Sequence, residues 1–91
     1  MTTLHTDVCV RNRLGLHARA AMKLVELIQA YDATIELQSG DKRATADSVM
    51  AMLMLESAQG QTITLTATGP QAEPALNAVK ALFDAGFDEE S

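Results

Sequence analysis

Three short segments alternate apolar and polar side chains, and this alternation limits the possible folds more than any other feature. The segments are residues 4–10, 34–38 and 61–67. Successive side chains of a strand point to opposite faces, so alternation predicts strands with one buried and one solvated face. The turn-forming sequence SGDK at 39–42 is followed by RATA at 43–46. We interpret 43–46 as a short return strand that forms a hairpin with 34–38.

Between the alternating segments, apolar residues follow the helical period. The first helix is predicted from Ala18 onward, with a buried stripe at i, i+3, i+4 and i+7 formed by Ala21, Leu24, Val25 and Ile28. A second helix is predicted over residues 47–55, with Asp47 or Ser48 as its N-cap.

A third helix is predicted near the C-terminus. Its buried face consists of Ala75, Val79, Leu82 and Phe83. Pro74 is compatible only with the first turn of this helix, and Gly86 is suited to its C-terminal cap. Residues 88–91 are then expected to form a frayed acidic tail.

The predicted order of elements is therefore β-α-β-β-α-β-α. Strands with one apolar face need cover on one side only, which three helices on one face of an antiparallel sheet would supply. We predict an α+β fold of the open-faced β-sandwich type, with a four-stranded antiparallel sheet, as a single domain over residues 1–91. A chain of 91 residues leaves little interior for a deep, enclosed pocket.

The composition excludes several classes of protein. The net charge of −5 disfavours nucleic acid as a partner, and no apolar run is long enough to span a membrane. Cys9 is the only cysteine, so an internal disulfide is impossible. With no secretion signal at the N-terminus, we expect a soluble, cytoplasmic domain, and a monomer as the simplest state.

The sequence gives no indication of a metal ion or cofactor. His5, Asp7 and Cys9 share one strand face, but four strand residues span about 13 Å, too far for His5 and Cys9 to bind one ion. The sequence also lacks a Gly-rich phosphate loop, catalytic carboxylate pairs and nucleophile–base triads.

His17 lies immediately before the first predicted helix, and Arg19 follows two residues later. The first N–H groups of a helix have no intrahelical acceptor, and the helix dipole is positive at that end. This position therefore attracts anions and favours a neutral imidazole that could attack a phosphoryl group. Arg19 could then bind the phosphate oxygens. From spacing alone, the simpler interpretation is a polar loop histidine followed by a solvated arginine.

Two segments carry a resemblance to a known family. GLHARAAMKL resembles the active-site segment of the HPr family, the histidine-containing phosphocarriers of the bacterial phosphotransferase system, whose pattern is Gly-[Leu/Met]-His-[Ala/Thr]-Arg-Pro-Ala. DSVMAMLMLESAQGQTI resembles the second signature of the family. The phrases MLMLESAQG, TGPQ and ALFDAGFDEE are most similar to its nitrogen-related branch, NPr.

The resemblance implies a phosphotransfer relay and not a free-standing enzyme. His17 would accept the phosphoryl group through Nδ1 from enzyme I and pass it to a histidine on an EIIA-type protein. Arg19 and Ala18 would bind the phosphate, and Gly15 would permit the close approach to the helix. Ala20 departs from the pattern, which has proline there. We predict that this difference leaves the fold unchanged, and that phosphotransfer weakens if Arg19 is drawn away from His17.

The second predicted helix is apolar on nearly every side. Met52 and Leu55 are predicted to face the core. The remaining apolar residues of this helix, Val49, Met50 and Leu53, are then predicted to form an exposed apolar surface, which Met22 on the first helix extends. The resemblance implies that both partners dock there, whereas a fully wrapped helix is the plainer alternative.

Ser48 aligns with a serine that a dedicated kinase phosphorylates in some HPr proteins, although helix capping is the simpler role. A sugar-transport HPr, a regulatory ligand-binding domain and a pure interaction module remain alternative functions.

Overall fold

The computed structural model describes residues 3–88. Its elements are β1 (Thr3–Cys9), α1 (Ala18–Ile28), β2 (Thr34–Ser39), β3 (Lys42–Thr45), α2 (Val49–Leu53), β4 (Thr62–Thr68), α3 (Ala72–Asp84) and a short 3₁₀ turn, η1 (Gly86–Asp88). This order confirms the one predicted from periodicity, with η1 added after the third helix.

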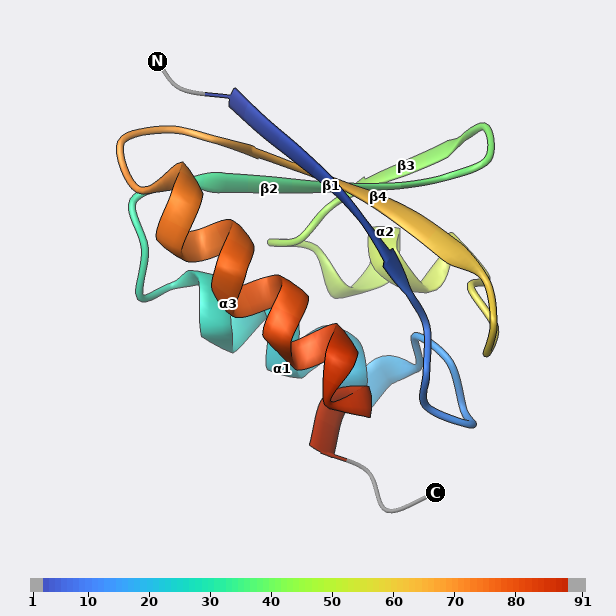
Figure 1. Ribbon diagram of the computed structural model, residues 1–91. Helices are drawn as coiled ribbons and strands as arrows, with labels where there is room; N and C mark the ends of the chain where they lie inside the picture. Colours follow the sequence, from blue (N-terminus) through green and yellow to red (C-terminus); the bar gives the residue numbers. More distant parts are fainter. Residues whose placement is uncertain (1–2, 89–91) are drawn as a thin grey trace.

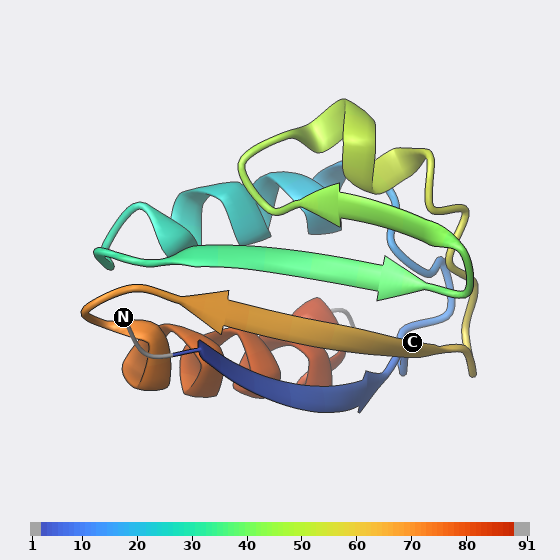
Figure 2. The same cartoon turned by 90° about the horizontal axis from the view of Figure 1, so that it is seen from above.

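The four strands form one antiparallel sheet in the order β1-β4-β2-β3 (Figure 2). All three helices lie on one face of this sheet, as Figure 1 shows, and no element within residues 3–88 covers the other face. The β2–β3 hairpin turns at Gly40, whose φ of 61° suits glycine. The predicted open-faced β-sandwich is confirmed.

The core lies between the sheet and the helices. Val8, Ile35, Leu37, Ile63 and Leu65 point inward from the strands and are all buried. In the register, Val8 lies opposite Ile63 and Leu37 opposite Leu65. The apolar residues of the alternating segments therefore form the buried face of the sheet, as predicted.

The first helix buries a wider face than its predicted stripe. Ala21 and Leu24 are fully buried as expected, and Val25 and Ile28 pack partly against the core. Ala20, outside the predicted stripe, is also fully buried. Because α1 contacts both α2 and α3, its buried surface exceeds one narrow stripe.

The second helix is shorter than predicted. It covers five residues instead of the interval 47–55, because Ser48 caps its start and the chain turns beyond Met54. Glu56 then adopts a left-handed φ of 53°, which a continuing helix could not accommodate. Met52 and Leu55 are buried, as predicted.

The residues predicted to mark the two ends of the third helix are confirmed. Pro74 is the third residue of α3, and Gly86 follows the C-cap residue Ala85 with a φ of 62°. Of the predicted acidic tail, only Asp88 falls among the described residues; residues 89–91 lie outside them.

Candidate functional site

His17 is the N-cap residue of α1. Its backbone is extended, with φ −83° and ψ 178°, and its carbonyl accepts the first helical hydrogen bond from the N–H of Ala21 at 2.9 Å. Its Nδ1 accepts a hydrogen bond from the backbone N–H of Arg19 at 3.2 Å. The ring therefore lies at the opening turn of the helix, where a side-chain acceptor satisfies an otherwise unpaired donor.

This contact determines which ring nitrogen is available for chemistry. Because Arg19 donates to Nδ1, that nitrogen carries the lone pair, and we assign the ring proton to Nε2 from this hydrogen bond. The lone pair points toward the positive end of the helix dipole. Ala18 and Arg19 are exposed in the first turn, and His17 is half-buried. Nδ1 thus presents a lone pair beside main-chain donors that favour an anion.

Gly15 is required by two features of the loop before the helix. Its φ of 69° is left-handed, and a Cβ there would overlap the carbonyl oxygen of Ser57. That carbonyl accepts a hydrogen bond from the N–H of Leu16 at 3.0 Å, and the Gly15 carbonyl accepts one from the N–H of His17 at 3.0 Å. The glycine therefore lets two loops touch directly beside His17.

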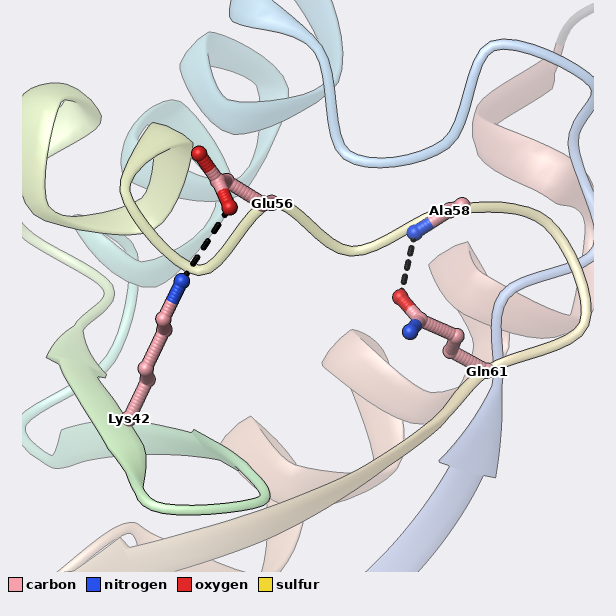
Figure 3. Close-up of polar contacts among 4 residues, drawn as sticks. All are labelled: Lys42, Glu56, Ala58 and Gln61. Atoms are coloured by element: carbon pink, nitrogen blue, oxygen red, sulfur yellow. Dashed lines mark hydrogen bonds and ion pairs between the residues drawn. The ribbon is translucent and has the colours of Figure 1, made fainter.

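Residues 56–61, in the loop between α2 and β4, support the site from a distant part of the sequence. Figure 3 shows two contacts of this loop: Lys42 Nζ of β3 lies 3.2 Å from Glu56 Oε2, and within the loop the Ala58 N–H donates to Gln61 Oε1 at 2.6 Å. Gln59 Nε2 donates to the carbonyl of Arg11 at 2.9 Å. Sequence reasoning missed this support because no local pattern reports a contact across more than forty residues.

Asn12 is a second residue that sequence reasoning missed. Its side chain is 2% exposed, and its Nδ2 donates to the Gly15 carbonyl at 2.6 Å. The Gly15 N–H in turn donates to the Asn12 carbonyl at 3.2 Å. In the sequence, an asparagine in a loop indicates only a turn. In the structure, Asn12 holds the Gly15 carbonyl, which accepts the hydrogen bond from the His17 N–H.

The sequence segment that contains His17 is basic, although the whole chain is acidic. Residues 8–25 contain four cationic residues and no Asp or Glu, although the chain carries −5: Arg11, Arg13, Arg19 and Lys23. Arg11 Nε lies 3.9 Å from Asp84 Oδ1 at the surface, a contact of little energetic weight. This basic segment favours approach of an anionic group or an acidic surface.

Four large apolar side chains are exposed in the described part of the chain: Leu14 (69%), Met22 (53%), Met50 (70%) and Met54 (70%). Met22 and Met50 were predicted to be docking residues. Of the other two predicted residues, Leu53 is half-buried and Val49 packs partly against the core. Leu14 and Met54 were not predicted. Since α1 and α2 contact each other, Met22 and Met50 come from adjoining helices.

Ser48 is the N-cap of α2. Its Oγ accepts a hydrogen bond from the Ala51 N–H at 3.2 Å, and the residue is half-buried. Of the two predicted caps, Asp47 and Ser48, the structure selects the serine. Within residues 3–88, no helix is long and apolar enough to cross a bilayer.

The chain resembles known proteins over nearly its whole length. A family model described as "PTS HPr component phosphorylation site" matches residues 4–85. The phosphocarrier protein NPr of Shewanella violacea is 52% identical over 91 residues, covering all of both chains. The phosphocarrier protein HPr of Cupriavidus necator is 35% identical over 86 residues, which is 94% of this chain and 97% of that one.

A solved structure of HPr-C-His from Thermoanaerobacter tengcongensis superposes with a TM-score of 0.90 at 30% identity, covering 97% of this chain and 99% of the other. Fold, family model and full-length identity therefore agree: the chain belongs to the HPr family of phosphocarriers, and it is more similar to the Shewanella NPr than to the Cupriavidus HPr.

Proposed function

We propose that His17 carries the phosphoryl group, on Nδ1, between a phosphohistidine of enzyme I and a histidine of an EIIA-type acceptor. The observation that carries this proposal is the hydrogen bond from the Arg19 N–H to His17 Nδ1 at the opening turn of α1. A lone pair on Nδ1 in this position supports the proposal, because main-chain donors and a basic segment there favour a dianion.

Transfer to His17 forms one bond and breaks another. The Nδ1 lone pair attacks the phosphorus, the bond from phosphorus to the donor imidazole breaks, and the donor nitrogen keeps the electron pair. The new phosphoryl group brings about −1.5 to −2 units of charge. The N–H groups of Ala18 and Arg19 then donate to its oxygens, with the exposed Arg19 guanidinium as a forked donor. The second transfer reverses these steps toward the acceptor, so no cofactor is required.

The nitrogen-related phosphotransfer system is the proposed setting. The higher identity to the NPr relative than to the HPr relative supports it over sugar transport. The relay would act in the cytoplasm, as a monomer. We propose that both partners dock on the surface around Met22, Met50 and Leu53, with the basic segment beside it.

Regulation at Ser48 is a separate part of the proposal. A phosphate on Ser48 would add negative charge at the edge of this docking surface and would remove the capping hydroxyl of α2. An HPr-type kinase would be the enzyme responsible.

Incubation with purified enzyme I and phosphoenolpyruvate tests the relay. The chain should gain one acid-labile, base-stable phosphate, and His17→Ala should gain none. His5→Ala is the matched control, because His5 is the other histidine and lies on β1, with its Nδ1 3.0 Å from Thr66 Oγ1. Phosphate uptake by His17→Ala, or its loss in His5→Ala, would contradict the assignment.

A further inference from the structure

The turn η1, at the C-terminal end of the described residues, has an unusual backbone conformation. Gly86, Phe87 and Asp88 have φ values of 62°, 57° and 62°, all in the left-handed region. For residues with a Cβ, this region costs about 1–2 kcal/mol each. Two such residues in succession require contacts that hold them, and strained backbone of this kind concentrates at functional sites.

A local hydrogen bond, from the Asp88 N–H to the Ala85 carbonyl at 3.2 Å, and two contacts with other elements hold this turn. The Phe87 side chain is 1% exposed, and its ring meets Phe83 of α3 edge-on, with centroids 4.8 Å apart and planes at 70°. Lys23 Nζ donates a hydrogen bond to the Phe87 carbonyl. Lys23 belongs to α1, six residues after His17. The turn therefore ties the helix that His17 caps to the C-terminal end of α3.

The same turn lies against the loop before His17. A Cβ added at Gly86 would lie 3.7 Å from Asn12 Cβ and 3.9 Å from its Cα, so Gly86 lies beside Asn12 with no room for a further residue between them. Asn12 holds the Gly15 carbonyl, which also receives the His17 N–H. The turn thus adjoins both supports of His17: it lies beside Asn12 of the loop, and it is hydrogen-bonded to Lys23 of the helix.

We propose that η1 is a positioning element for the phosphoryl-carrying ring, with Lys23 as its link to α1. The turn fixes the position of α1 relative to the loop of residues 12–15. It thereby maintains the hydrogen bond from the Arg19 N–H to His17 Nδ1. This inference rests on the proposed function. It implies that Lys23 and Phe87, which do not contact the phosphoryl group, influence the rate of phosphoryl transfer to His17.

Lys23→Met tests the proposal, because methionine keeps most of the apolar stem and removes the donor. In transfer from phosphorylated enzyme I, we expect kcat to fall roughly 2- to 12-fold, as for one lost hydrogen bond, with KM within about twofold. Lys23→Arg should restore kcat because it keeps a donor and the charge. Lys80→Met on the exposed surface of α3 is the matched control and should behave as the wild type.

Nitrogen NMR of the His17 ring supplies a readout that does not depend on phosphate. Lys23→Met and Phe87→Leu should both reduce the share of the tautomer with the proton on Nε2, while urea unfolding confirms that each variant is folded. An unchanged kcat with unchanged ring signals would overturn the inference. A higher KM alone would also overturn it, because Lys23 would then act in docking. If the wild-type chain takes up no phosphate, the proposed function fails, and the ring signals still decide the inference.

Discussion

Replacing Gly15 by alanine perturbs the site at the contact between its two loops. Gly15→Ala places a Cβ against the Ser57 carbonyl oxygen while the residue must keep a φ of 69°. The left-handed conformation costs about 1–2 kcal/mol. Displacing the Ser57 carbonyl from the Leu16 N–H costs a further 0.5–1.5 kcal/mol, roughly, for the lost hydrogen bond. Alanine also restricts the unfolded chain, which offsets about 0.4–1 kcal/mol, so we expect the free energy of unfolding to fall by about 0.5–3 kcal/mol.

Gly40→Ala is the matched control for this prediction. Gly40 has nearly the same φ, 61°, and a Cβ there would meet nothing within 4 Å. Its cost should be the backbone strain alone, about 1–2 kcal/mol, reduced by about 0.4–1 kcal/mol because alanine restricts the unfolded chain. Urea unfolding measures both variants, and the difference between them isolates the contact with Ser57.

The two glycine variants should also differ in activity. Gly15→Ala moves the peptide that receives the His17 N–H, so transfer from phosphorylated enzyme I should slow at saturating donor. Gly40→Ala lies in the β2–β3 turn and should transfer at the wild-type rate. Equal losses of stability in the two variants, together with equal transfer rates, would refute the reasoning.

Four further substitutions have defined expectations. Ser48→Ala should lower the free energy of unfolding by about 1 kcal/mol through loss of the α2 cap, with phosphorylation of His17 retained. An unchanged free energy of unfolding in urea would contradict a stabilising role for the cap. Leu53→Asp should keep the fold, by circular dichroism, and raise KM for enzyme I, so unchanged kinetics would count against the docking surface. Ala20→Pro should fold, and equal phosphotransfer rates before and after would mean that the family proline is dispensable here. Glu56→Gly should raise the free energy of unfolding by less than about 1 kcal/mol, because relief of the left-handed backbone is partly offset by a more flexible unfolded chain and by loss of the Lys42 pair; a lower stability would contradict this.

The fold was predictable because its elements follow local periodicity. Alternation placed Val8, Ile35 and Leu65 inward, and the helical period placed Leu24 and Val79 in the core. Both patterns arise within a few neighbouring residues, so one sequence suffices to read them. The length of α2 was not predictable in the same way, because the turn at Glu56 carries no glycine to mark it.

The site was only partly predictable, for the same physical reason. His17 could be placed at a helix start because the stripe after Ala18 is local. The supports from Ser57, Gln59 and Phe87 could not, because they join segments that are distant in the sequence and use backbone carbonyls as often as side chains. Backbone acceptors leave no mark on residue type, so only the folded chain reveals them.

The site of phosphorylation tests the central claim most directly. The chain, labelled with nitrogen-15 in histidine, is phosphorylated by enzyme I and phosphoenolpyruvate, and phosphorus–nitrogen coupling then identifies the bonded atom. The account predicts phosphorus on Nδ1 of His17, with shifted amide signals for Ala18 and Arg19. Phosphorus on Nε2, on His5 or on no histidine at all would contradict it.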